Sequence, residues 1–480
     1  MYKIDWKQYL SPERFRTSNF NGNNEGKQWA AYSTEHRTPF ESDFGRVAFS
    51  SAVRRMHDKT QVMPLTSGDS VHTRLTHCVE VMSIAYSLGI DLCRDEEFRK
   101  LYTDGEIVNL ERDIPMILKT AAFVHDIGNP PFGHFGETVI QDYFKGYLRR
   151  RQITDAQALD FIHFDGNAEG FRILTRLQYI GDLAGLNLTY ATLATYTKYP
   201  NIGDINKKYI GSKKHGIFTS EKEIFDNMVE KCNLKTESGK IKRHPLSFLL
   251  EASDSICYYI MDIEDGFTME WYTFDEIVDF LNKKYDEDGS KTNILDKLNL
   301  TEKLEKYKHD DRRKMTEFRV ATVSYLVDLA IKRFKEHLEE IDKGKYSEEL
   351  IEDNDNLAKY LGSFAKAYIY PNPQIEQIEL TGHSVLTGLF EKLLYYAFNQ
   401  DKNIRNRLKS IISKTSLRIA LHTNDNAPTQ YIYYDRQRLN EFDFEELDEY
   451  GRLRLIVDFI SGMTDKFAVL LYQKLSGLKL

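Results

Sequence analysis

The chain has 480 residues, 41% hydrophobic and 29% charged, a balance typical of a folded globular protein rather than a disordered or membrane-spanning one. Its formal net charge of -8 would repel polyphosphates and nucleic acids at long range, so an anionic substrate would need a local cationic pocket. We see no signal peptide, no run of about 18 apolar residues and no Cys-x-x-Cys spacing. We therefore expect a cytoplasmic protein that neither spans a membrane nor holds a cysteine zinc site.

Apolar residues recur at helical spacing along most of the chain, which contains only 11 prolines. Residues 18–45 are rich in Asn, Gly, Ser and Thr, so they predict irregular structure before a first helix near Phe49–Met56. The sequence therefore predicts an all-α protein. Further helices are expected over Ile114–Val124, Leu246–Ile263, Ser384–Phe398 and Leu453–Leu475.

The patterning divides the chain into three segments. We expect an irregular or helical arm over 1–45, a helical core over 46–270, and a C-terminal helical region over 271–480 that packs on the core as one structural unit. An insert at about 201–240 opens with a glycine- and lysine-rich run that predicts a loop or short hairpin. A small β or irregular insert is expected around Ala427–Tyr434.

A His-Asp pair ends one of these apolar helices. His125 and Asp126 precede Ile-Gly-Asn-Pro-Pro131, which must stop the helix. His77 and Asp254 lie on two other helical patterns, so four ligands from three helices would cage one divalent ion. Taken singly, His77 is more often a hydrogen-bonded core histidine, and Asp254 a surface or capping carboxylate.

The next segment, Pro131-Phe-Gly-His134-Phe-Gly-Glu137, is a turn-rich loop that should reopen into a helix. A histidine that titrates near neutral pH can donate a proton to a leaving oxygen. Glu137, three residues on, can hold the imidazole in its useful tautomer and raise its basicity. The alternative is an acidic helix cap beside an incidental histidine.

The whole string from His125 to Glu137 resembles the signature of the dGTP triphosphohydrolase family, a branch of the HD phosphohydrolase superfamily. Further matching segments spread the resemblance over nearly the whole chain. They are Arg37–Arg46, Arg54–Val62, His163–Arg172, Arg243–Leu246, Asp262–Gly266 and Asp458–Ala468.

The resemblance implies a metal held by His77, His125, Asp126 and Asp254, and chemistry on the α-phosphorus served by His134 and Glu137. It also implies that Arg74 binds the α-phosphate, that Tyr258 packs on the deoxyribose and that Asp262 accepts from the 3′-hydroxyl. Tyr258 and Asp262 follow Asp254 at four-residue spacing, so the three share one helix face. The predicted substrate-binding set is Arg74, Gln61, Tyr258, Asp262, Lys213 and Lys214, although a solvated lysine loop is an alternative for the last two.

Asn129 occupies a position where many HD enzymes have a further histidine, so we expect a single metal ion. Mn²⁺ or Mg²⁺ is expected, and the mixed nitrogen and oxygen ligands would also accept Fe, Co, Ni or Zn. The resemblance further implies a homo-oligomer, a tetramer or a hexamer. Some relatives bind single-stranded DNA, and the low basicity of this chain argues against strong non-specific binding but leaves room for a local groove.

We therefore predict a metal-dependent hydrolase that cleaves deoxynucleoside triphosphates, dGTP first among them, into deoxynucleoside and triphosphate. One alternative keeps the site but changes the substrate to nucleoside monophosphates, cyclic nucleotides or alarmones. Another is a nucleotide-regulated regulator that binds nucleic acid. An intact ligand set together with the pair His134 and Glu137 argues against a pure binding module.

Overall fold

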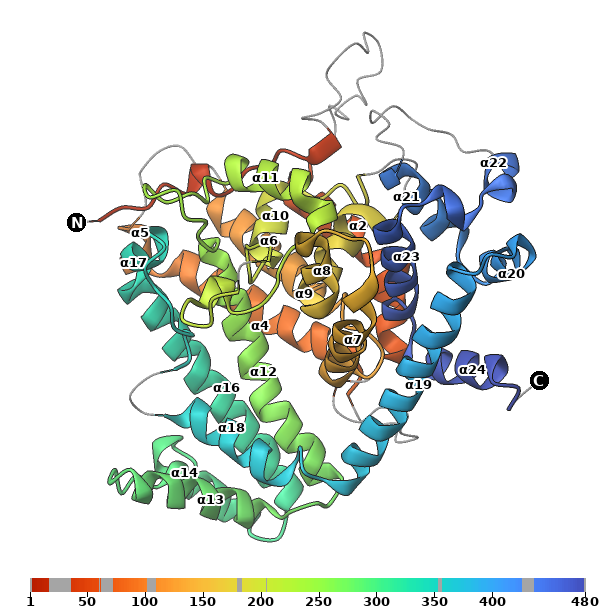
Figure 1. Cartoon of the computed structure of the whole chain (residues 1–480). Coiled ribbons are helices and arrows are strands. Elements are labelled where there is room, and N and C mark those ends of the chain that lie inside the picture. Colours follow the sequence, from red (N-terminus) through yellow and green to blue (C-terminus); the bar gives the residue numbers. More distant parts are fainter. Residues whose placement is uncertain are drawn as a thin grey trace.

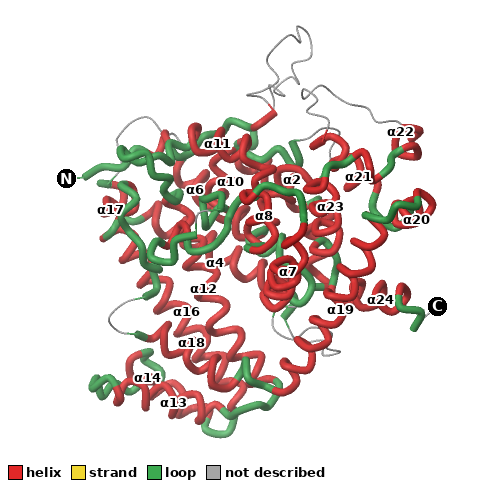
Figure 2. Tube along the Cα trace, in the orientation of Figure 1, coloured by secondary structure: helices red, strands yellow, loops and turns green. Residues whose placement is uncertain are grey.

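The computed structural model is an assembly of helices (Figure 1), and the tube view shows helix and loop only (Figure 2). Within the described residues, β pairing is limited to two isolated antiparallel bridges. The predicted all-α fold is confirmed, whereas the insert expected around 427–434 lies outside the described residues. The structure describes residues 2–16, 36–59, 61, 72–101, 109–178, 184–203, 205–352, 356–424 and 436–478.

The first half of the chain carries the helices that surround the candidate site. They are α2 (Pro39–Ala48), α3 (Ser51–Arg55), α4 (Arg74–Arg94), α5 (Glu96–Arg99), α6 (Leu110–Phe123), α7 (Gly133–Tyr147), α8 (Asp155–Ile162), α9 (Gly166–Arg172), α10 (Tyr190–Tyr196), α11 (Lys222–Lys231) and α12 (Pro245–Thr268).

The second half flanks them. Its helices are α13 (Phe274–Glu287), α14 (Ile294–Lys297), α15 (Thr301–Leu304), α16 (Asp311–Glu336), α17 (Leu338–Asp342), α18 (Leu357–Tyr368), α19 (Pro373–Ala397), α20 (Lys402–Lys409), α21 (Lys414–Asn424), α22 (Arg436–Glu441), α23 (Glu449–Ser461) and α24 (Asp465–Leu475). None of the helices in the described part of the chain is long and apolar enough to cross a bilayer.

Helices α4 and α6 pack along each other, and α12 contacts both of them. Gly89 of α4 allows this close approach, because a Cβ there would lie 2.7 Å from Cα of Pro115 in α6. Apolar side chains of the three helices join one large buried cluster that extends from Ile4 to Ile375. The three helices therefore form a rigid base for side chains placed at their ends.

A second buried cluster joins α7 and α8 to the C-terminal helices α19, α23 and α24. Phe144 of α7 contacts Phe161 of α8 and Phe390 of α19, with ring centroids 5.0 and 5.3 Å apart. The two clusters thus draw on both halves of the chain. The predicted division near residue 270 stays a prediction.

Three segments differ from the expected helix pattern. The segment 18–45, expected to be irregular, is already helical from Pro39, because Thr38 and Glu41 form a capping box and proline suits the first helical position. The stretch Leu453–Leu475 is two helices, since α23 ends at Ser461 and Thr464 caps α24. The insert 201–240 is not all loop, because it contains α11.

Candidate active site

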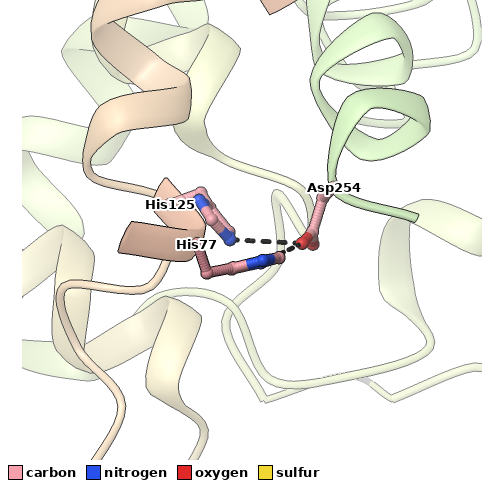
Figure 3. A group of neighbouring side chains, drawn as sticks. All are labelled: His77, His125 and Asp254. Carbon is pink, nitrogen blue, oxygen red and sulfur yellow. Dashed lines mark hydrogen bonds and ion pairs between the residues drawn. The ribbon is translucent and has the colours of Figure 1, made fainter. Parts of the chain in front are cut away.

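Three parts of the helical base bring two histidines and an aspartate together (Figure 3). His77 lies on α4, His125 follows α6 and Asp254 lies on α12. Nε2 of His77 and Nε2 of His125 are 3.3 and 3.2 Å from Oδ1 of Asp254. Both imidazoles are buried. Three of the four predicted metal ligands therefore converge on one point.

The orientation of His125 fits a metal ligand. Its Nδ1 lies 2.8 Å from the carbonyl oxygen of Ala122, which can only accept, so Nδ1 carries the proton. This leaves the lone pair of Nε2 facing Asp254. That atom is buried and makes no hydrogen bond within the described residues. Two imidazole nitrogens and a carboxylate are a donor set that suits a divalent cation.

Asp126, the fourth predicted ligand, lies beside this cluster. Its Oδ1 is 3.6 Å from Nε2 of His125, and its Oδ2 forms an ion pair with the buried Arg74. Burial alone would raise the pKa of Asp126, but Arg74 and the neighbouring histidines outweigh burial and hold this pKa below its usual value. The carboxylate therefore stays ionised, as a ligand must be. Its coordination of a metal stays a prediction.

Helix α7 carries the predicted catalytic pair. Nδ1 of His134 lies 3.0 Å from Oε2 of Glu137, whose Oε1 accepts the backbone N–H of Gly166 at 2.7 Å. The Glu137 carboxylate raises the pKa of His134, because the negative charge favours the imidazolium form. Glu137 is buried, whereas the His134 side chain is 70% exposed. The pair thus presents one imidazole with a fixed carboxylate partner.

The start of α7 is an unusual turn. Phe132 and Gly133 both have left-handed backbone angles, with φ of 63° and 58°. A Cβ on Gly133 would overlap the guanidinium of Arg74, and one on Gly136 would overlap the carbonyl of Pro131. These two glycines therefore let the helix start directly against the cluster, which explains the Gly-His-Phe-Gly sequence.

The ligand cluster and the catalytic pair each contribute a side chain to one cavity of about 520 Å³. Asp126, Asp254 and His134 line it, as does Asn129, and no second His, Cys, Asp and Glu group of this kind occurs in the described residues. The six predicted substrate-binding residues line the same cavity. They are Gln61, Arg74, Lys213, Lys214, Tyr258 and Asp262.

Two of these residues bring unpartnered polar atoms to the cavity. Nε of Arg74 and Oε1 of Gln61 are buried without a hydrogen-bond partner among the described residues. Buried polar atoms normally have partners, so atoms left without one beside a cavity indicate groups that await a ligand. An unpartnered N–H and an unpartnered oxygen on residues that line the cavity fit a polar substrate.

Comparisons with known proteins agree with this geometry. The HD domain family matches residues 74–160, and the phosphohydrolase-associated domain family matches residues 431–474. A deoxyguanosinetriphosphate triphosphohydrolase-like protein of Synechocystis is 32% identical over 494 residues, covering 99% of this chain and 100% of the relative. The chain belongs to the dGTP triphosphohydrolase family. The match to the HD domain implies that the chain binds a divalent metal.

Other relatives cover the chain equally well. A deoxyguanosinetriphosphate triphosphohydrolase-like protein of Listeria innocua is 33% identical over 490 residues, with 99% of this chain and 100% of the relative aligned. The deoxyguanosinetriphosphate triphosphohydrolase of Salmonella enteritidis is 29% identical over 528 residues, with 99% and 98% aligned. This member of the dGTP triphosphohydrolase family therefore aligns with these relatives over nearly its whole length.

Sequence reasoning missed Lys198, which lines the cavity of this dGTP triphosphohydrolase family member and pairs with Oδ2 of Asp254. The available signal was a lysine directly after the otherwise uncharged run Tyr190–Thr197, since a charged group that ends a buried helix needs a partner. Tyr370 was also missed. Its hydroxyl donates to Oδ2 of Asp262 at 3.3 Å, and it follows α18 with no sequence motif around it.

The two predicted lysines of the insert each have an acidic neighbour. Nζ of Lys213 is 3.5 Å from Oε1 of Glu349, and Nζ of Lys214 is 3.1 Å from Oδ2 of Asp165. Burial disfavours the charge of Lys214, but Asp165 and Glu137 outweigh it and raise the pKa of this lysine. Both lysines therefore line the cavity beside acidic partners, with 33% of the Lys213 side chain and 41% of the Lys214 side chain exposed.

Proposed function

We propose that the chain hydrolyses deoxynucleoside triphosphates at the α-phosphorus, with dGTP as the preferred substrate, and releases deoxynucleoside and triphosphate. One observation supports this most: a metal-ligand cluster, an acid–base pair and a group of cations share one cavity. The chain is acidic overall, yet the positive groups gather where a polyphosphate would bind. These cations are Arg74, Lys198, Lys213 and Lys214.

His77, His125 and Asp254 would hold one divalent ion, with Asp126 as the fourth ligand. A bound Mn²⁺ or Mg²⁺ polarises a phosphate oxygen and activates water. Arg74 is the positively charged neighbour of Asp126, lines the cavity and has one N–H without a partner among the described residues, so it can bind the α-phosphate next to the ligands.

His134 supplies the proton that the departing 5′-oxygen needs. Its Nδ1–H donates to Glu137, which leaves Nε2 as the atom that donates to the substrate. Because Glu137 raises the pKa of His134, the imidazole is protonated over a wider pH range than a free histidine. Protonation of the leaving oxygen makes the deoxynucleoside a neutral product.

The face of α12 that carries Tyr258 and Asp262 would bind the sugar of the substrate. Tyr258 lies between the ligand Asp254 and the carboxylate of Asp262 along the helix, and all three line the cavity. Packing of Tyr258 against the ring would leave no room for a 2′-hydroxyl, and Asp262 would accept from the 3′-hydroxyl. Tyr370 holds Asp262 by its hydrogen bond.

The test is to incubate the purified protein with each of the four deoxynucleoside triphosphates and with GTP, in the presence of Mn²⁺ or Mg²⁺. Nucleosides, orthophosphate and triphosphate are then separated. Equal amounts of deoxynucleoside and triphosphate support the proposal and rank the bases. Release of orthophosphate, or hydrolysis of only monophosphates, cyclic nucleotides or alarmones, contradicts it.

A second candidate function, regulation by a nucleotide at a separate site, is favoured by a larger cavity of about 1040 Å³. Arg46, Arg54 and Arg55 line it, and burial together with the charge of Arg54 lowers the pKa of Arg55. Phe49 at its edge is 84% exposed, so it offers a ring for stacking. Assays with pairwise nucleotide mixtures test this, and an unchanged response in R54A/R55A contradicts it.

We also propose that the chain works as a homo-oligomer whose neighbouring subunits complete the base contacts. Sedimentation of the purified protein measures the assembly, and a monomer that keeps full activity contradicts the proposal.

A further inference from the structure

Asp160 of α8 is a fully buried carboxylate that does not line the active-site cavity. It accepts hydrogen bonds from Nε2 of His215 at 3.1 Å and from the hydroxyl of Tyr450 at 2.6 Å. The backbone N–H of Thr219 lies 3.0 Å from both of its oxygens, and the Thr219 hydroxyl donates at 3.2 Å. A buried carboxylate with this many donors fixes the backbone that supplies them.

His215 bridges two stretches of chain. Its Nδ1 accepts the backbone N–H of Gly203 at 3.2 Å, and since an amide can only donate, Nε2 carries the proton that goes to Asp160. The ring is buried, with 1% of its surface exposed. His215 therefore locks residues 213–219, here called the lysine segment, to α8 on one side and to Gly203 on the other.

The lysine segment in turn lies against residues 198–203. Nδ2 of Asn201 donates to the backbone carbonyl of Lys214 at 2.6 Å. The backbone carbonyl of Asn201 accepts the N–H of Ile217 at 3.1 Å. Gly216 has no room for a side chain, because a Cβ there would overlap the carbonyl of Tyr199. This pairing brings Lys213 and Lys214 to the same cavity as Lys198.

We propose that Asp160 and His215 are positioning residues for the triphosphate, because they hold the lysine segment so that Lys213 and Lys214 reach the β- and γ-phosphates. Lysines on a free loop would lose backbone and side-chain entropy on binding, whereas an anchored segment has already lost much of it on folding. This inference rests on the proposed function and adds the residues that prepare its phosphate site.

The test compares His215→Phe with His215→Gln in the full chain loaded with Mn²⁺. Phenylalanine keeps an aromatic ring of similar shape but removes both hydrogen bonds, whereas glutamine keeps a hydrogen-bond donor and an acceptor. For His215→Phe we expect about tenfold weaker binding of inorganic triphosphate by calorimetry and about a tenfold higher KM for the nucleotide. We expect kcat and Mn²⁺ affinity close to wild type, and partial rescue by His215→Gln.

Tyr450→Phe is the matched control, because it removes a donor to the same carboxylate without touching the lysine segment. It should lower the Tm while triphosphate affinity stays within about twofold. If His215→Phe does not fold, Gly216→Ala displaces the segment from Tyr199 and should weaken triphosphate binding in the same way.

Two results would overturn the positioning role. One is a folded His215→Phe or Gly216→Ala variant with wild-type triphosphate affinity. The other is an equal loss of affinity in Tyr450→Phe. A wild-type protein that binds triphosphate but cleaves no deoxynucleoside triphosphate would overturn the proposed function alone, and one that binds no triphosphate would overturn both.

Discussion

The backbone N–H of Phe132 donates a hydrogen bond of 2.9 Å to Oδ1 of Asp465, which lies 333 residues further along the chain. Phe132 and Gly133 are the two left-handed residues directly before His134, and Asp465 is the first residue of α24. The ring of Phe132 also packs against α19 at Gly382, where a Cβ would lie 2.8 Å from it. The C-terminal helices therefore hold the turn that aims the predicted catalytic histidine.

Asp465→Ala should lower kcat more than it changes KM, because Phe132 loses its acceptor and the turn before His134 loosens. A buried N–H left without a partner also costs about 1–3 kcal/mol of stability. Asp465→Asn keeps an acceptor oxygen and should be milder in both respects. Steady-state kinetics and chemical denaturation of the two variants measure this, and wild-type kcat in folded Asp465→Ala would contradict it.

The helical fold and most of the site could be predicted from local patterns. The glycines and prolines of the segment 127–136 placed His125, Asp126 and His134 at helix ends, and four-residue spacing placed Asp254, Tyr258 and Asp262 on one face. Such signals lie within one or two helical turns, where the spacing of residues along the sequence determines which side of the helix each side chain faces. The resemblance to a family then related the separate pieces to one another.

The remaining features depend on contacts between distant segments. Nothing near Asp465 shows that its carboxylate caps Phe132, and nothing near Tyr370 shows that it reaches Asp262. The break at Gly462 is equally difficult, because the apolar spacing of α23 continues into α24 and only the capping by Thr464 separates them. Tertiary packing decides these points.

Asp126→Ala should abolish turnover, since it removes one predicted ligand and leaves Arg74 without its ion-pair partner. We expect at least a tenfold loss of metal affinity, comparable to the loss of other ligand-shell interactions. Metal content after dialysis and activity against added Mn²⁺ measure this. An Asp126→Ala protein that binds the metal normally and turns over at the wild-type rate would exclude the ligand role.

Chelation offers a direct test of the metal requirement. Removal of divalent ions with a chelator should abolish hydrolysis, and Mn²⁺ or Mg²⁺ should restore it, because His77, His125 and Asp254 form a donor set for the ion that would activate water. Activity and metal content are measured before and after reconstitution. Full activity in protein free of metal would contradict the prediction.

His134→Ala should keep metal and nucleotide binding but lower kcat by about 10²- to 10⁴-fold, the usual contribution of a general acid. The ligand cluster does not include His134, so metal content is the control. A variant that turns over at the wild-type rate would remove His134 from the chemistry.

Glu137→Gln should shift the pH dependence of kcat. The Glu137 carboxylate raises the pKa of His134, so it keeps the proton on the imidazole to higher pH. Without this negative charge, His134 loses its proton at lower pH, and the alkaline limb of the profile should move toward acid. An alkaline limb that stays in place, measured over the full profile, would assign that limb to another group.

Tyr258→Ala should weaken discrimination against ribonucleotides. Tyr258 lines the cavity one helical turn from Asp254, and its ring is tilted against Tyr259 with centroids 4.3 Å apart, so a packed aromatic pair limits the space beside the sugar. Removal of the ring creates room for a 2′-hydroxyl, and kcat/KM for GTP should rise relative to dGTP by about tenfold, the scale of one small steric contact. Tyr258→Phe keeps the ring and serves as the control. An unchanged ratio of the two kcat/KM values in Tyr258→Ala would place the selection against ribose elsewhere in the cavity.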